Sequence, residues 1–333
     1  MKADPAAPLW PSAPASSYSS PALPGPVDAR RRRGGRPMAS AALAGAAALW
    51  AAYTPVTSVA ATSAVVTVPM PVTLLLPIQV AVAAAVLWLA VVLRGHRPPG
   101  PVRRLVLLGA LEPAANCTLF ALALTIVPAA AGSLLLSSES VLVALLGVLV
   151  LKERLGRAGW AAVLACLPGL WLLAGADTLV DLSPGALLVF AATAASALYA
   201  TAAAWPPRTE HVRGMDALTM TTWQFTFGLA WVSLLPLGHL LTSSHTIISA
   251  VTHTSAGAWW AAIGGGLLLA APCLLYNHAI RHVGIARAGV ILNLIPVFGA
   301  AIAVIWLGDT LSGRHLLGAT ITLAGITILA ARR

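Results

Sequence analysis

The sequence predicts an all-α integral membrane protein with ten transmembrane helices, arranged as two five-helix repeats of inverted topology. Composition is the first reason: the 333-residue chain is 59% hydrophobic and only 9% charged, with a mean hydropathy of +0.86. Soluble domains carry about 25% charged residues. The second reason is the recurrence of apolar runs long enough to cross the ~30 Å hydrocarbon core of a bilayer. The third is a match of the chain to itself.

The ten apolar runs are separated by short polar or Pro/Gly-rich breaks. They are expected at residues 39–60, 70–93, 104–126, 130–151, 158–175, 184–204, 216–240, 257–280, 286–307 and 314–331. Residues 1–37 are rich in Pro, Ser and Ala and end in RRRRGGRP, which predicts a disordered basic tail. All three cysteines fall inside expected helices, so we expect neither a disulfide framework nor a zinc site.

The basic residues predict the orientation, because cytoplasmic loops carry the excess of Lys and Arg. With a cytoplasmic N-terminus, ten crossings place 19 of the 20 basic residues on the cytoplasmic side and leave only Arg314 outside. Adding or removing one helix would destroy this sorting. The basic residues that give the net charge of +10 are therefore distributed between the expected helices, which argues against a surface for nucleic acid. We expect a multi-pass protein of the bacterial plasma membrane with both termini cytoplasmic.

The self-match joins residues 109–174 to residues 265–330 without a gap, at an offset of 156 positions, with 19 identities. The most informative identities are Gly109 with Gly265, Cys117 with Cys273, and Gly169 with Gly325. Each unit would contain five helices, and an odd number forces the second unit to enter the membrane upside down. Secondary transporters commonly have this arrangement, with their substrate site near the midplane between the repeats.

Two segments, SLLLSSESVLVALLGVLVLKERL in the first half and GVILNLIPVFGAAIAVIWLGDTL in the second, resemble the pattern of the drug/metabolite transporter superfamily, specifically its ten-helix EamA-type members. The resemblance implies two EamA repeats, residues 38–175 and 184–331, and a transport function. The first copy departs from the pattern, with Ser140 where the second copy has Pro296 and Lys152 where the family usually has Gly.

Two carboxylates, Glu139 and Glu112, lie inside expected helices, each roughly 14 Å from a helix end at 1.5 Å per residue. No Lys or Arg stands at that depth, so the neutral acid is favoured there. A carboxyl group that alternates between protonated and ionised forms suits a proton-coupled carrier. The alternative is a permanently protonated Glu139 that hydrogen-bonds a neighbouring helix. For Glu112, the alternative is that Glu112-Pro113 marks only a kink with locally satisfied backbone groups.

Other polar residues of the expected helices are candidates for substrate contact. Asn116 and Phe120 share a helical face with Glu112, because spacings of four place residues in line. Tyr276, Asn277 and Asn293 come from the second half, where Asn293 is the repeat partner of Ser137. Polar side chains within the membrane also serve as contacts between helices, and this reading stays open for all of them.

The function that fits these residues is secondary active transport, specifically proton-coupled export of small metabolites, amino acids or drug-like amines by alternating access. An intramembrane enzyme, or a channel or scaffold protein without coupled transport, is the alternative. We expect no catalytic residue, cofactor or metal, and no ATP hydrolysis, since the chain lacks a phosphate-binding loop. The expected partners are a small-molecule substrate, a proton and the lipid bilayer, with no nucleic acid. Homodimer formation stays open.

Overall fold

The computed structural model describes residues 26–63, 66–95, 103–150, 156–174, 183–204, 216–237, 244–279 and 291–331. Over these ranges the chain forms helices, turns and loops, and no strand. The helices are α1 (Pro26–Ala61), α2 (Val72–Leu93), α3 (Arg103–Gly109), the π-helical turn η1 (Ala110–Ala115), α4 (Asn116–Leu124), α5 (Ala129–Leu135), α6 (Ser138–Leu149), α7 (Arg157–Leu173), α8 (Pro184–Ala204), α10 (Ala217–Val232), α12 (Ser244–His253), α13 (Ala256–Ala279), α15 (Leu294–Ile302), η2 (Ala303–Leu307) and α16 (Gly313–Ala331).

Six of the helical segments in the described ranges are long and apolar enough to cross a membrane. They are Met38–Ala61, Val72–Leu93, Arg103–Leu124, Ala129–Leu149, Pro184–Ala203 and Ala256–Tyr276. Two shorter apolar helices occupy Gly159–Leu173 and Leu294–Leu307. The expected all-α membrane architecture is confirmed at this level, and the count of ten crossings stays a prediction.

The first helix begins earlier than expected. α1 starts at Pro26, inside the segment assigned to the disordered tail, and residues 1–25 lie outside the described part of the chain. The arginines of the basic run favour a helix, but Gly34, Gly35 and Pro37 between that run and the apolar stretch oppose one, so helix propensity does not account for the extension.

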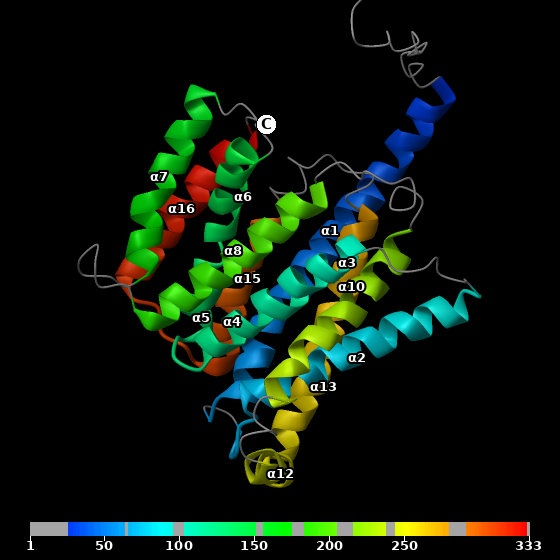
Figure 1. Cartoon of the computed structure of the whole chain (residues 1–333). Helices are drawn as coiled ribbons and strands as arrows, with labels where there is room; N and C mark the ends of the chain where they lie inside the picture. The colour runs from blue at the N-terminus through cyan, green and yellow to red at the C-terminus, as the bar shows by residue number, and fades with distance from the viewer. Residues whose placement is uncertain are drawn as a thin grey trace, which may run out of the picture.

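The helices pack in pairs that recur when the two halves of the chain are exchanged. α1 packs against α13 and α15, and α8, its counterpart in the second half, packs against α4 and α6. In the same way, α2 contacts α13 while α10 contacts α3. Two further pairs join a helix to its own counterpart: α2 with α10, and α7 with α16. Figure 1 shows α7 and α16 side by side on one flank of the bundle and α2 on the opposite flank.

Glycines allow the closest of these approaches. A Cβ atom at Gly169 of α7 would overlap the Thr322 hydroxyl of α16, and a Cβ at Gly325 would lie 2.5 Å from Cys166 Sγ. Cys166 and Thr322 are themselves equivalent at the offset of 156 residues. The α7–α16 contact is therefore nearly symmetric, and small residues at this seam bring the two backbones together.

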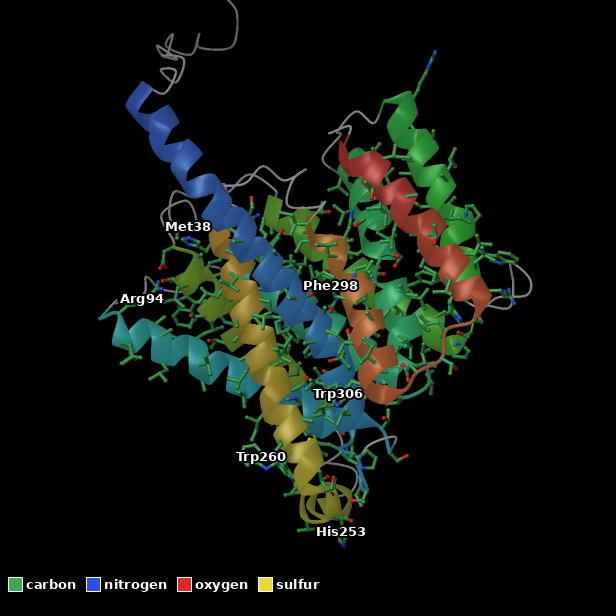
Figure 2. All side chains as sticks on the ribbon, turned by 180° about the vertical axis from the view of Figure 1, so that it is seen from behind. Met38, Arg94, His253, Trp260, Phe298 and Trp306 are labelled. Carbon is green, nitrogen blue, oxygen red and sulfur yellow. The ribbon has the colours of Figure 1, made fainter. Side chains whose placement is uncertain are left out.

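The outer faces of the bundle are apolar. Exposed side chains include Leu89 on α2, Leu164 on α7, Trp260 on α13, and Ile305 and Trp306 on η2. Figure 2 shows Trp260 and Trp306 with Phe298 of α15 on this outer surface. So much exposed apolar surface is unusual for a soluble protein. It suits contact with lipid, and the chain is a multi-pass membrane protein.

A loop residue ties the second half to the first. After η2, Gly308 adopts a left-handed conformation with φ of 70°, which turns the chain toward Asp309. The Asp309 carboxylate accepts a hydrogen bond at 2.8 Å from the backbone N–H of Ala130, in the first turn of α5. Helix N-termini expose unpaired N–H groups that favour such an acidic partner.

Candidate functional site

The third expected helix is broken at its midpoint, where α3 passes through η1 into α4. Glu112 has extended backbone angles, φ of −139° and ψ of 115°, between helical neighbours. Pro113 explains the break, because a proline disfavours the helical conformation of the residue before it. The proline ring sits against Gly228 of α10, where a Cβ atom would lie 2.6 Å from Pro113 Cδ.

This break corrects one expectation about the site. Glu112 was expected to share a helical face with Asn116 and Phe120. Glu112 is itself extended, however, so it stands outside the helical register of Asn116 and Phe120, which both lie in α4. Asn116 instead donates a hydrogen bond from Nδ2 to the carbonyl oxygen of Ala192 in α8 at 3.0 Å. Phe120 is buried in the core. Pro113 marks the position of the break in the sequence, but the expectation treated the helix as bent there with its register unchanged.

The backbone carbonyl of Glu112 finds its partner on another helix. Gln224 of α10 donates from Nε2 to the Glu112 carbonyl oxygen at 2.9 Å, and Tyr199 of α8 donates its hydroxyl to Gln224 Oε1 at 3.2 Å. The Glu112 carboxyl group is 3.7 Å from the sulfur of Cys117, which donates to its Oε1. The alternative interpretation of Glu112-Pro113 assumed that the freed backbone groups are satisfied locally, but the Glu112 carbonyl is satisfied by a side chain 112 positions away.

A second break separates α5 from α6 and places Glu139 in the first turn of α6. Ser196 of α8 donates its hydroxyl to Glu139 Oε1 at 2.8 Å. The side chains of Glu139 and Glu112 are both partly exposed, and their carboxyl groups are close enough to interact electrostatically. Within the described ranges, neither has an ion-pair partner.

Asn293, the repeat partner of Ser137, also lies at a helix break, immediately before α15. Its Oδ1 accepts a hydrogen bond from the Ser140 hydroxyl at 3.2 Å, so the broken helices of the two halves meet at these two residues. Asn293 Nδ2 is buried without a partner. A buried donor of this kind is costly unless something else binds it.

Tyr276 of α13 is partly exposed and packs against Trp50 of α1, with ring centroids 5.7 Å apart and planes tilted by 57°. Glu139 lies within electrostatic range of its phenol. Tyr276 and Trp50 therefore belong to the neighbourhood of the two carboxyl groups. Asn277 follows in α13, but its side chain lies outside the described part of the structure.

Sequence reasoning missed two buried amides. Gln79 of α2 accepts a hydrogen bond from the Tyr53 hydroxyl at 3.0 Å and donates to Thr57 Oγ1 at 3.2 Å. Gln224 occupies the corresponding helix of the second half. The available signal was weak: each is the sole Gln in its half, and each follows a tyrosine of the preceding helix by 26 or 25 positions.

The arrangement brings together two carboxyl groups, amides, hydroxyls and an aromatic pair at the breaks of three helices. Carboxyl groups without a cationic partner can take up and release protons, and interrupted helices near the midplane are typical binding elements of membrane transporters. The described residues contain no group of three or more His, Cys, Asp or Glu side chains placed to hold a metal ion.

Two segments of the chain, residues 38–175 and 183–331, match the sequence model of the EamA-like transporter family. The fold is also similar to solved structures, of which 22 chains match significantly. One crystal structure matches 88% of this chain and 97% of its own, with a TM-score of 0.61 and 20% sequence identity. At that identity the likeness shows a shared fold alone. A comparison with curated proteins finds no significant match.

Proposed function

Because the chain belongs to the EamA-like transporter family, a membrane transporter family of the drug/metabolite superfamily, we propose that it is a proton-coupled secondary transporter. Its substrates are small metabolites, amino acids or drug-like amines, which it exports by alternating access. Glu139 and Glu112 carry the proton, and Asn116, Tyr276, Asn277 and Asn293 surround the substrate. Family membership gives a membrane transporter; the coupling ion, the direction of transport and the substrate class are proposed in addition.

The observation that carries the proposal is the setting of Glu139. Its carboxyl group lies in the first turn after a helix break, partly exposed, with a single hydroxyl from Ser196 as its described hydrogen-bond partner. An ionised carboxyl group in that position is costly in a membrane unless it binds a cation or takes up a proton. Proton and substrate can compete for such a carboxyl group as the helices around it rearrange.

The packing of the helices supports alternating access. Exchanging the two halves maps the contacts of α1 onto those of α8 and the contacts of α2 onto those of α10. An inverted repeat has two related conformations, because each half can adopt the arrangement of the other. The sorting of 19 of 20 basic residues supports a bacterial plasma-membrane protein with both termini in the cytoplasm.

The two carboxyl groups favour a cationic or zwitterionic substrate over an anion, since an anion would be repelled by the ionised form. The aromatic pair of Trp50 and Tyr276 supports the same choice, because the face of an aromatic ring attracts a cation.

The experiment is substrate-driven proton flux in liposomes that contain the purified protein and an internal pH dye. The wild type and Glu139→Gln are challenged with amino acids and organic amines. We expect saturable flux in the wild type and at least a tenfold loss in the variant, since Gln cannot release a proton; about 1.4 kcal/mol corresponds to tenfold. Equal flux in both would remove Glu139 from the coupling step, and no flux with any compound would overturn proton coupling.

The same assay separates the alternatives. A channel would give flux that does not saturate with substrate and cannot drive protons against their gradient. An intramembrane enzyme would convert the compound, and mass spectrometry of the liposome contents would detect the product.

A further inference from the structure

The two halves hold their buried glutamines in matching scaffolds. Gln79 in α2 and Gln224 in α10 are 0% and 1% exposed. Each accepts a hydrogen bond on Oε1 from a tyrosine of the preceding helix, Tyr53 or Tyr199.

Each glutamine also lies against one of the repeat-related glycines. A Cβ at Gly265 of α13 would overlap the side-chain amide of Gln79, and a Cβ at Gly109 of α3 would lie 2.6 Å from the backbone carbonyl oxygen of Gln224. Both glycines therefore allow a close approach to the helix that carries the glutamine, but only Gly265 contacts the amide itself.

The second hydrogen bond of each glutamine differs between the halves. Gln79 Nε2 donates to the Thr57 hydroxyl of α1, whereas Gln224 Nε2 donates to the backbone carbonyl of Glu112. The repeat equivalent of Glu112 is Leu268, which lies inside the continuous helix α13. A continuous helix uses its own carbonyl groups, so Gln79 meets none that is free. In the second half, the Gln224 amide thus binds the backbone carbonyl at the helix break, next to the Glu112 side chain, whereas Gln79 in the first half only joins two helices.

We propose that Gln224 is a positioning residue for Glu112. Pro113 already keeps residue 112 out of the helix, and the Gln224 amide, by holding the carbonyl of this extended residue, fixes the direction of the freed peptide group. The open backbone sets where the Glu112 carboxyl group lies, next to Cys117 Sγ and within electrostatic range of Glu139. Tyr199 in turn fixes the amide by its bond to Oε1. This inference rests on the proposed role of Glu112 in proton coupling.

Without the amide, the partly buried Glu112 carbonyl would lose its described hydrogen-bond partner. The chain relieves such a group by forming a new local hydrogen bond, because buried backbone carbonyls are almost always paired. Because Pro113 still keeps residue 112 out of the helix, the freed peptide group would turn toward another donor, which moves the Glu112 carboxyl group relative to Glu139. The consequence is a changed proton equilibrium at the site, with the rest of the bundle intact.

The experiment compares Gln224→Met with the matched control Gln79→Met, since methionine keeps the length of the side chain and removes the amide. Substrate-driven proton flux in liposomes is measured across a range of pH for both variants and the wild type. We expect the pH of half-maximal flux to move by about one unit in Gln224→Met and to stay unchanged in Gln79→Met. Equal shifts in both variants, or none in either, would overturn the proposal.

A double variant tests whether Gln224 acts through Glu112. In a Glu112→Gln background, adding Gln224→Met should leave the remaining flux and its pH profile within about twofold, because the effects of residues acting as one unit do not add. Independent, multiplying losses would assign Gln224 a general structural role.

A milder pair of variants covers the case in which Gln224→Met does not fold. Tyr199→Phe removes only the hydroxyl that fixes Gln224, and Tyr53→Phe is its counterpart at Gln79. Tyr199→Phe should shift the pH profile in the same direction as Gln224→Met, by less, and Tyr53→Phe should not. The absence of this difference counts against the positioning role. Wild-type protein that carries no flux would instead refute the proposed function itself.

Discussion

Two pairs of repeat-related helices have diverged to very different extents. α7 and α16 meet along a seam where Gly169 faces Thr322 and its equivalent Gly325 faces Cys166, so both sides use the same small-residue contact. The third helix and its equivalent α13 have lost that likeness: one is broken at Glu112, and the other is continuous through Leu268. Symmetry persists at the α7–α16 seam, where the helices only have to pack, and is lost at Glu112, whose repeat equivalent is the apolar Leu268.

The strongest test of this contrast is Gly169→Val. The new side chain would meet the Thr322 hydroxyl and the Gly318 carbonyl oxygen, the latter 2.8 Å from the Cβ position. Since backbone cannot move aside as a flexible side chain can, we expect a cost above about 3 kcal/mol and loss of the folded protein. Size-exclusion chromatography and thermal unfolding in detergent measure it.

Gly313→Val is the control for this variant, because no atom lies within 4 Å of a Cβ at that position in the first turn of α16. A folded, equally stable Gly169→Val protein would show that the seam is loose.

The next test makes the broken helix resemble its partner. Pro113→Ala allows residue 112 to return to helical angles and its carbonyl to bond within the helix. We expect the protein to fold and substrate-driven proton flux to fall about tenfold, equivalent to ~1.4 kcal/mol, because the Glu112 carboxyl group moves.

Pro272→Ala is the matched control for the broken helix, since Pro272 lies inside the continuous helix α13. Flux that survives Pro113→Ala but fails in Pro272→Ala would show that transport depends on the proline of α13 and not on the break at Glu112.

The smallest effect is expected where the halves touch through a loop. Asp309→Ala removes the acceptor for the Ala130 N–H and should lower the free energy of unfolding by about 1 kcal/mol, as for other lost helix caps. Asp309→Asn keeps an oxygen acceptor and should lose less. Thermal unfolding of both variants checks the order, and equal stability of Asp309→Ala and the wild type would mean that the contact contributes nothing.

Much of this architecture is predictable from the sequence, because lipid imposes long apolar segments and loops collect the charges. The family resemblance and the membrane character are confirmed. Pro113 also indicated the position of a break. The conformation of that break was not predictable, since a proline can bend a helix or expel one residue from it, and the choice depends on what a neighbouring helix offers.

Gln224 illustrates what the sequence could not supply. It is a single amide in an apolar helix, and its partner is a backbone group 112 residues away. Backbone carbonyls have no signature in the sequence, so no pattern joins these positions. Glu139 is different: a carboxylate in an apolar run is conspicuous, and its partner Ser196 was the only part hidden. The roles of all six candidate residues stay predictions.

The burial of the three thiols has a practical consequence for spectroscopy. Cys117, Cys166 and Cys273 are all buried, so water-soluble maleimides and nitroxide reagents have little access to the native protein. The wild-type protein with its three cysteines can therefore serve as the unlabelled control, and none of these cysteines needs to be removed. Cysteines introduced at Gly156 and Gly313, where nothing lies within 4 Å of the new Cβ, would carry paired spin labels at the starts of α7 and α16. Their separation would provide a fixed ruler along the symmetric seam, against which movements of the broken helices could be read.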